Sequence, residues 1–329
     1  MNTWREGVEV VAEGLGVGPG LGAVALALIL FLTAGTTVRG WGRLRKSDPE
    51  ARRRWHSVAT WWILTVLFLV VLAFGPPAVV LVMGGLSLLL LREALRLVAE
   101  EQLLIAGMAL VIGVYAWAWL DWETLFLAAF PVVLVILVVI DLLWRWSEAR
   151  RKATPPWLRR ARPLAGAPFL AVLGPSYAVA VAYLPAPAGL PASGMGWLAL
   201  LFVLTELNDS AQAWGGRAFG VRRMAPRLSP GKTWAGFWSG LLTTAMASAV
   251  IGPLITSYAG RLRLGALGLG LLIALAGIAG DLLESSLKRQ AGVKDSGDLL
   301  PGHGGLMDRF DSLAMTAPVF FAVTWILWF

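Results

Sequence analysis

The chain has 329 residues, of which 57% are hydrophobic and only 15% charged, and it carries a formal net charge of +8 with a mean hydropathy of +0.71. This composition excludes a soluble globular protein, because a soluble fold of this size cannot bury so many long apolar segments. The basic residues lie in short loops between these segments. This placement indicates that their charge orients the chain in the membrane and argues against nucleic-acid binding. Cysteine is absent, which excludes thiolate catalysis and cysteine-ligated metal.

The apolar segments predict an all-α polytopic membrane protein with about ten transmembrane helices. Each run is continuous in hydrophobicity, which is typical of spanning helices and not of barrel strands. The N-terminal segment is acidic and lacks the basic region of a cleavable signal peptide, so we expect it in the mature protein. Gly75, Pro76 and Pro77 alone interrupt residues 58–91, which leaves open two spans or a re-entrant hairpin. The expected spans are 21–38, 58–74, 78–91, 103–120, 124–144, 167–185, 192–213, 235–258, 264–283 and 312–329.

The distribution of basic residues predicts the orientation, because loops rich in Lys and Arg stay in the cytoplasm. With the first loop inside, all of the 28 Lys and Arg except Arg5, Arg261 and Arg263 are cytoplasmic. The polar segments 214–233 and 288–311 then face the cytoplasm too. The basic, proline-containing loop 150–163 separates an N-terminal region of plain spans, 1–163, from a C-terminal region, 164–329, that holds the unusual polar sequence.

The ninth expected span ends in a polar stripe. Asp281, Ser285 and Lys288 stand at positions i, i+4 and i+7, so they share one face of a helix. A carboxylate near membrane depth costs about 3 kcal/mol on insertion scales, so Asp281 is expected to face a partner or a water-filled cavity. Simple pairing of Asp281 with Lys288 or Arg289 at the interface is the alternative.

A glycine-rich loop follows this stripe. Its glycines allow backbone amides to approach an anion closely or to adopt positive φ. Asp308 and Asp311 then stand at i and i+3, a spacing that can hold a hard divalent cation, while basic residues such as Arg309 can hold phosphate oxygens. The two aspartates could instead only stabilise the start of the last helix. That alternative leaves the convergence of Asp281, Lys288 and Arg309 on one loop unexplained.

A second polar segment lies at residues 204–236. Asn208, Asp209 and Gln212 end an apolar helix, and the run SPGKT follows at 229–233. The GKT triplet does not form a P-loop, because Pro226 stands where that motif requires glycine.

The run SSLKRQAGVKDSGDLLPGHGGLMDRFD at 285–311 resembles, in full, the signature of the phosphatidate cytidylyltransferase (CDP-diacylglycerol synthase) family. SPGKTWAG at 229–236 is similar to the family's Ser-Pro-x-Lys-Thr-x-x-Gly motif. The resemblance covers about residues 200–313. It implies a membrane enzyme that joins CTP and phosphatidate into CDP-diacylglycerol and pyrophosphate, with Mg²⁺ as cofactor. Many members carry Asp-Thr-x-Ala-Tyr where this chain has DSAQA at 209–213, which leaves the lipid acceptor open.

The resemblance also implies roles for residues of this chain. Asp281 and Asp308 are similar to the family's metal ligands, with Asp311 close by and a second metal ion possible. The residues implied in catalysis and phosphate handling are Asp281, Lys288, Arg289, Lys294, Asp295, His303, Asp308 and Asp311. Those implied in substrate binding are Asn208, Asp209, Ser229, Lys232, Thr233, Ser285 and Arg309.

Two other functions remain open at this stage. The chain could transfer a cytidylyl group to a different lipid phosphate, or it could be an anion transporter in which Asp281 couples to ion movement. The polar residues gather in two cytoplasmic loops instead of paired broken helices, which argues against the transporter. The expected setting is the inner membrane of a bacterium, among membrane lipids and without nucleic acid, and a homodimer is left open.

Overall fold

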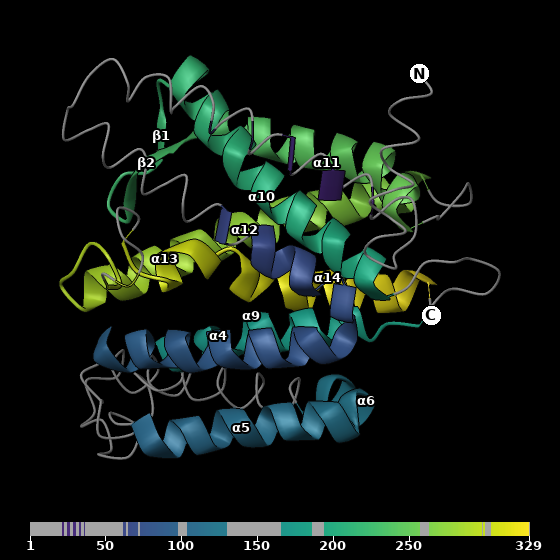
Figure 1. The fold of residues 1–329 in the computed structure, drawn as a ribbon. Helices are drawn as coiled ribbons and strands as arrows, with labels where there is room; N and C mark the ends of the chain where they lie inside the picture. The colour runs from purple at the N-terminus through teal and green to yellow at the C-terminus, as the bar shows by residue number, and fades with distance from the viewer. Residues whose placement is uncertain are drawn as a thin grey trace.

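The structure, a computed structural model, describes residues 73–97, 104–129, 166–185, 194–256, 263–297, 299 and 304–328, together with scattered positions between 22 and 71. Apart from one small hairpin, the regular elements among these residues are helices (Figure 1). The elements are α4 (Pro76–Leu97), α5 (Leu104–Leu120), α6 (Trp122–Thr124), the π-helix η2 (Leu125–Ala129), α9 (Ala167–Ala182), α10 (Gly194–Phe219), β1 (Arg223–Ala225), β2 (Ser229–Thr233), α11 (Trp234–Thr256), α12 (Arg263–Gln290), α13 (Met307–Phe310) and α14 (Leu313–Trp328).

The helices pack as a series of neighbours. α10 packs on α11, α11 on α12, α12 on α14, α14 on α9, α9 on α4 and α4 on α5. Figure 1 shows α10, α11 and α12 above α14, with α9, α4 and α5 below. One hydrophobic core includes side chains from α4, α9, α10 and α14, such as Val79, Val179, Leu201 and Phe320. The core therefore crosses position 163, although the expected division into two regions stays a prediction.

The structure confirms a mostly helical chain with membrane-spanning character, but not the count of ten spans. Within the described ranges, four helical segments are long and apolar enough to cross a bilayer: Pro76–Leu97, Trp234–Pro253, Leu264–Gln290 and Met307–Trp328. Two apolar helices are shorter, Leu104–Leu120 and Leu170–Ala182. α10 has 26 residues but is not among the four, because Glu206, Asn208 and Asp209 lower its hydropathy. Parts of the remaining expected spans lie outside the described residues.

Three boundaries differ from the expectation. α4 starts at Pro76 and continues to Leu97, so its 22 residues are long enough for a full span, which favours two spans over a re-entrant hairpin. Gly75 separates it from the preceding helical residues with a φ of +71°, and Pro76 is tolerated in a first helical turn because its missing N–H has no partner there. α12 runs past the expected end at position 283 to Gln290. Residues 223–233, expected as loop, form the hairpin β1–β2.

Candidate active site

The hairpin β1–β2 carries Lys232 toward the helix bundle. β1 pairs antiparallel with β2, with Arg223 opposite Thr233. Thr233 ends the hairpin and its Oγ1 accepts a hydrogen bond from Gly236 N at 3.1 Å, which caps the first turn of α11. A Cβ on Gly236 would lie 2.6 Å from the carbonyl oxygen of Gln212, so glycine lets α10 and α11 approach closely here. Lys232 is consequently held beside the polar end of α10.

Lys232 and Ser312 bring three elements together. The Nζ of Lys232 forms an ion pair with Asp281 on α12 and lies 3.4 Å from Gln212 Oε1 on α10. On the other side of Asp281, Ser312 Oγ lies 2.5 Å from Asp281 Oδ1 and 2.9 Å from Asp209 Oδ2. One hydroxyl has one proton, so Ser312 donates to only one of these carboxylates at a time. The alternative in which Asp281 merely pairs with Lys288 or Arg289 is therefore wrong in this structure.

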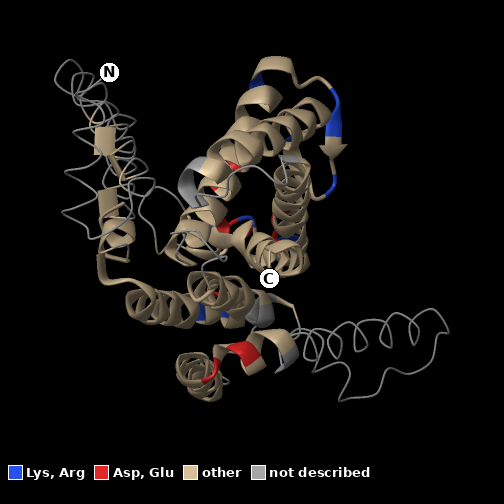
Figure 2. Ribbon diagram, turned by 90° about the vertical axis from the view of Figure 1, so that its right-hand side faces the viewer, with Lys and Arg blue, Asp and Glu red and all other residues tan. Residues whose placement is uncertain are grey.

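A third carboxylate joins this group. Asp311 lies next to Ser312, accepts a hydrogen bond from Ser312 N at 2.8 Å, and is repelled electrostatically by Asp281 and Asp209. Acidic and basic segments also lie close together inside the C-terminal helices in Figure 2. Three carboxylates around the one ammonium of Lys232 leave an excess of negative charge within the helix bundle, which suits a divalent cation.

Lys288 organises the neighbouring cluster. Its Nζ lies 2.5 Å from Glu284 Oε2 and 2.6 Å from Asp308 Oδ1. Asp308 also accepts hydrogen bonds from Gly305 N at 2.8 Å and from Ser296 N at 3.2 Å. The carboxylate of Asp308 is thus already bound by one ammonium and two backbone amides. Asp308 and Asp311 point into different clusters, although their spacing predicted a shared face.

The glycine-rich loop does approach anions closely, and among the described residues those anions are the protein's own carboxylates. Gly304 has a φ of +82°, and a Cβ there would lie 2.9 Å from Asp308 Oδ2. A Cβ on Gly297 or Gly305 would lie 2.9 Å from a carboxylate oxygen of Glu93, which comes from α4. The expected backbone geometry is confirmed, and its use is to hold side chains of the site.

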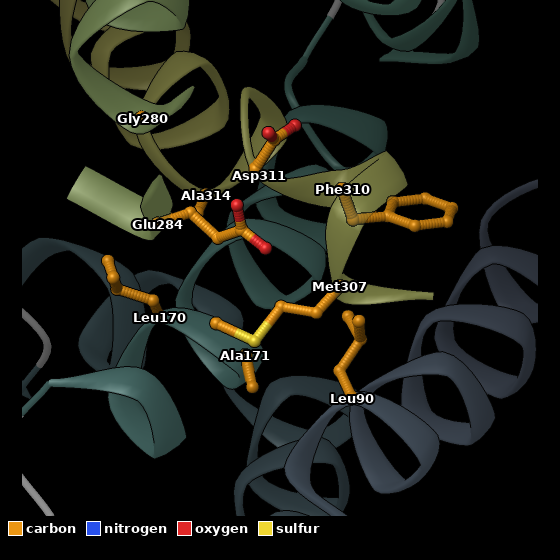
Figure 3. A pocket seen from close by; sticks show the side chains of 9 residues that line it. All are labelled: Leu90, Leu170, Ala171, Gly280, Glu284, Met307, Phe310, Asp311 and Ala314. Atoms are coloured by element: carbon orange, nitrogen blue, oxygen red, sulfur yellow. The ribbon is translucent and has the colours of Figure 1, made fainter. Parts of the chain in front are cut away.

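Glu284, Ser312 and Glu93 belong to these clusters but were not predicted. Glu284 is 2% exposed, and with Asp311 it presents its carboxylate to a small pocket that apolar residues of α4 and α9 also line (Figure 3). Its position four residues before Lys288 was a usable signal, because Glu and Lys at i and i+4 pair on a helix. Ser312 gave no such signal, since a serine following an aspartate is common in any sequence.

Several predicted residues are not brought into the two clusters. Asn208 is fully buried, and added Cβ atoms on Gly240 and Gly277 would press against its amide, so it packs between α11 and α12. Arg289 donates to Val293 O at 3.1 Å. Lys294 and Asp295 are exposed, and Arg309 is exposed and interacts electrostatically with Glu206. Ser229 and Ser285 are half-buried, and Thr233 caps α11. His303 lies outside the described residues.

No group of three Asp, Glu or His side chains in the described part of the chain already has the geometry of a metal site. The donor set still fits Mg²⁺, which usually takes one or two carboxylates and completes its shell with water and substrate phosphates. Asp311 supplies oxygens of that kind, and Asp281 does so once Lys232 leaves it, whereas the oxygens of Asp308 accept from Lys288, Ser296 and Gly305.

The comparisons with known proteins agree with the resemblance seen in the sequence. The sequence model described as the cytidylyltransferase family matches residues 55–327. The phosphatidate cytidylyltransferase of Mycobacterium bovis is 32% identical over 263 residues, which cover 77% of this chain and 82% of that protein.

Two further relatives match a shorter part. The phosphatidate cytidylyltransferase of Pseudomonas aeruginosa is 42% identical over 130 residues, and the uncharacterized protein YnbB of Escherichia coli is 53% identical over 128 residues. These matches cover 48% and 42% of the two relatives, so the chain spans less than half of their length. Because the family model matches most of this chain, residues 55–327, the chain belongs to the cytidylyltransferase family.

Proposed function

We propose that this protein transfers the cytidylyl group of CTP to phosphatidate, giving CDP-diacylglycerol and pyrophosphate. Relatives from Mycobacterium bovis and Pseudomonas aeruginosa carry the name of this activity. The observation that carries the proposal is the contact of Lys232 with Asp281, because it joins the SPGKT segment to α12, the helix in which the signature at 285–311 begins. The cations and carboxylates of that site are the groups that a reaction between two phosphates requires.

The reaction needs no protein nucleophile. An oxygen of the phosphatidate phosphomonoester forms the new bond to the α-phosphorus of CTP, and the bond from that phosphorus to the bridging oxygen of the β-phosphate breaks, so that pyrophosphate leaves. Both reactants are anions, so catalysis depends on orientation and on neutralising charge. In this proposal Lys232 moves from Asp281 to the triphosphate. Lys288, oriented by Glu284 and Asp308, stabilises phosphoryl oxygens.

The proposal assigns Mg²⁺ to Asp281 and Asp311. Bound there, the ion would neutralise phosphate charge and orient the triphosphate. Asp308, which the sequence also placed among the ligands, instead orients Lys288, and a second metal ion stays a prediction. The Ser312 hydroxyl lies within hydrogen-bond distance of both Asp281 and Asp209 and donates to one of them at a time.

The proposed setting is the cytoplasmic face of a bacterial inner membrane. It is supported by the basic residues of the loops and by the four apolar helices. A site on that face has access to CTP from the cytoplasm and to the lipid from the bilayer. A homodimer stays a prediction, which the mass of the detergent-solubilised protein would test.

The experiment is an assay of purified, reconstituted protein with labelled CTP, Mg²⁺ and a panel of lipid phosphates. The expected result is pyrophosphate release and a CDP-lipid only when CTP, Mg²⁺ and phosphatidate are all present. If product forms with another lipid phosphate and not with phosphatidate, the proposed acceptor is wrong but the proposed cytidylyl transfer holds. If folded protein forms no CTP-dependent product with any lipid phosphate, the proposed enzymatic function is refuted and the anion transporter becomes the better hypothesis.

A further inference from the structure

Glu93 is a buried carboxylate on α4, outside the two polar segments. Its side chain is 5% exposed. It accepts hydrogen bonds from Leu306 N at 3.0 Å, Met307 N at 2.9 Å and Ser296 Oγ at 3.2 Å. All three donors belong to the loop that carries Asp308. A buried carboxylate is costly unless hydrogen-bonded, so these contacts indicate a specific partner for the loop.

The loop is shaped to receive this carboxylate. Side chains at Gly297 and Gly305 would each place a Cβ 2.9 Å from one of the Glu93 oxygens. Glycine at these two positions lets the backbone close around the carboxylate from both sides. Leu306 and Met307 also pack with Leu90 and Ala94 of α4, so apolar contacts hold the same surfaces together.

The residues bound to Glu93 also hold Asp308. Ser296 donates its hydroxyl to Glu93 and its backbone N–H to Asp308, and Met307, whose N–H donates to Glu93, precedes Asp308 in the chain. Asp308 in turn accepts from Lys288. Hydrogen bonds thus connect Glu93 through Ser296 and Asp308 to the ammonium of Lys288.

We infer that Glu93 is a positioning residue, which fixes residues 296–297 and 304–308 so that Asp308 holds Lys288 in the geometry needed for phosphate chemistry. The effect on turnover rests on the proposed function, whereas the effect on the loop does not. Glu93 itself acts through Asp308 and Lys288 and contacts no reactant.

Hydrogen exchange of the full-length protein in detergent measures the loop directly. Glu93→Ala removes the acceptor of the Leu306 and Met307 amides, so peptides that contain these amides are expected to exchange at least about tenfold faster. Peptides covering β1 and β2 serve as an internal reference and are expected to keep their rates. Arg92→Gln changes the exposed neighbour of Glu93 and is the matched control, with unchanged exchange throughout.

Kinetics separate positioning from general stability. Displacement of a catalytic group by about 1 Å can cost about a hundredfold in rate, so Glu93→Ala is expected to lower kcat on the order of 10- to 100-fold with little change in the KM for CTP. Glu93→Gln keeps the volume but turns an N–H donor toward the loop amides, and we expect an intermediate loss. If Glu93→Ala fails to fold, the same measurements of exchange and kcat on Glu93→Gln are compared with the parent protein.

Two outcomes would overturn the inference: unchanged exchange at residues 306–307, or faster exchange there with kcat unaltered. Inactivity of the parent protein with every lipid phosphate is a different result. It would refute the proposed function, while the exchange comparison would still decide whether Glu93 holds the loop.

Discussion

Lys232 on β2 forms an ion pair with Asp281 on α12, and so connects two polar segments that are 49 positions apart in the chain. Both side chains are mostly buried, with 17% and 16% of their surfaces exposed. The pair lies between Gln212 of α10 and Ser312, so β2, α12, α10 and the turn between α13 and α14 meet at it.

Replacement of this lysine tests its proposed role with CTP. Lys232→Met keeps the apolar stem and removes the ammonium. A hydrogen bond to a charged group contributes roughly 1.5–3 kcal/mol, so kcat/KM for CTP is expected to fall about 10- to 100-fold, mainly through a higher KM. Arg227→Gln removes a cation from the exposed turn of the same hairpin and is expected to leave both constants unchanged. If kcat/KM for CTP fell equally in the two variants, the loss would reflect the general positive charge of the hairpin and not a specific role of Lys232.

The carboxylates can be distinguished by their response to Mg²⁺. In the parent protein, Mg²⁺ is expected to raise the thermal unfolding temperature. Asp281→Asn and Asp311→Asn are expected to lower turnover on the order of a hundredfold and to weaken this rise. Asp308→Asn is expected to lower turnover while the thermal response to Mg²⁺ remains, because Asp308 orients Lys288. If Asp308→Asn alone abolished the thermal response, the assignment of the ion to Asp281 and Asp311 would be wrong.

Thiol labelling tests the proposed orientation, and the absence of cysteine means that single cysteines are labelled without background. Gly231→Cys and Val293→Cys suit this test, because a Cβ at position 231 meets nothing within 4 Å and Val293 is 38% exposed. Both are expected to react only from the cytoplasmic side. Glu123→Cys, at an exposed position of α6, is expected to react only from the opposite side. Labelling of positions 231 and 123 from one side would refute the orientation.

The contact of α9 with α14 depends on a glycine. A Cβ on Gly174 would lie 2.8 Å from the backbone of Ala314, so Gly174→Ala must push the helices apart, and we expect a clear fall in the thermal unfolding temperature. Gly268→Ala on α12 meets nothing within 4 Å and serves as the matched control. Alanine favours helix by roughly 1 kcal/mol over glycine, so this control is expected to unfold at the same or a higher temperature. Similar losses in both variants would contradict the packing argument.

The amino-acid sequence alone determined the class of the protein and its family. Long apolar runs are decisive because backbone polar groups in a bilayer must be satisfied within each helix. The stripe of Asp281, Ser285 and Lys288 followed from helical periodicity and lies within α12 as predicted. The signature at 285–311 predicted the family, which the family model confirmed.

Only the tertiary structure decided which charges meet. Sequence spacing left open a pairing of Asp281 with Lys288 and placed Asp308 on one face with Asp311, yet Lys232 binds Asp281 and Lys288 binds Asp308. Such pairings depend on how helices far apart in the chain pack, which no local pattern encodes. Glu93 follows the expected span 78–91 and gave no signal in the sequence. Its donors are more than 200 residues away, and only the packing of α4 against residues 296 and 306–307 brings them within hydrogen-bond distance.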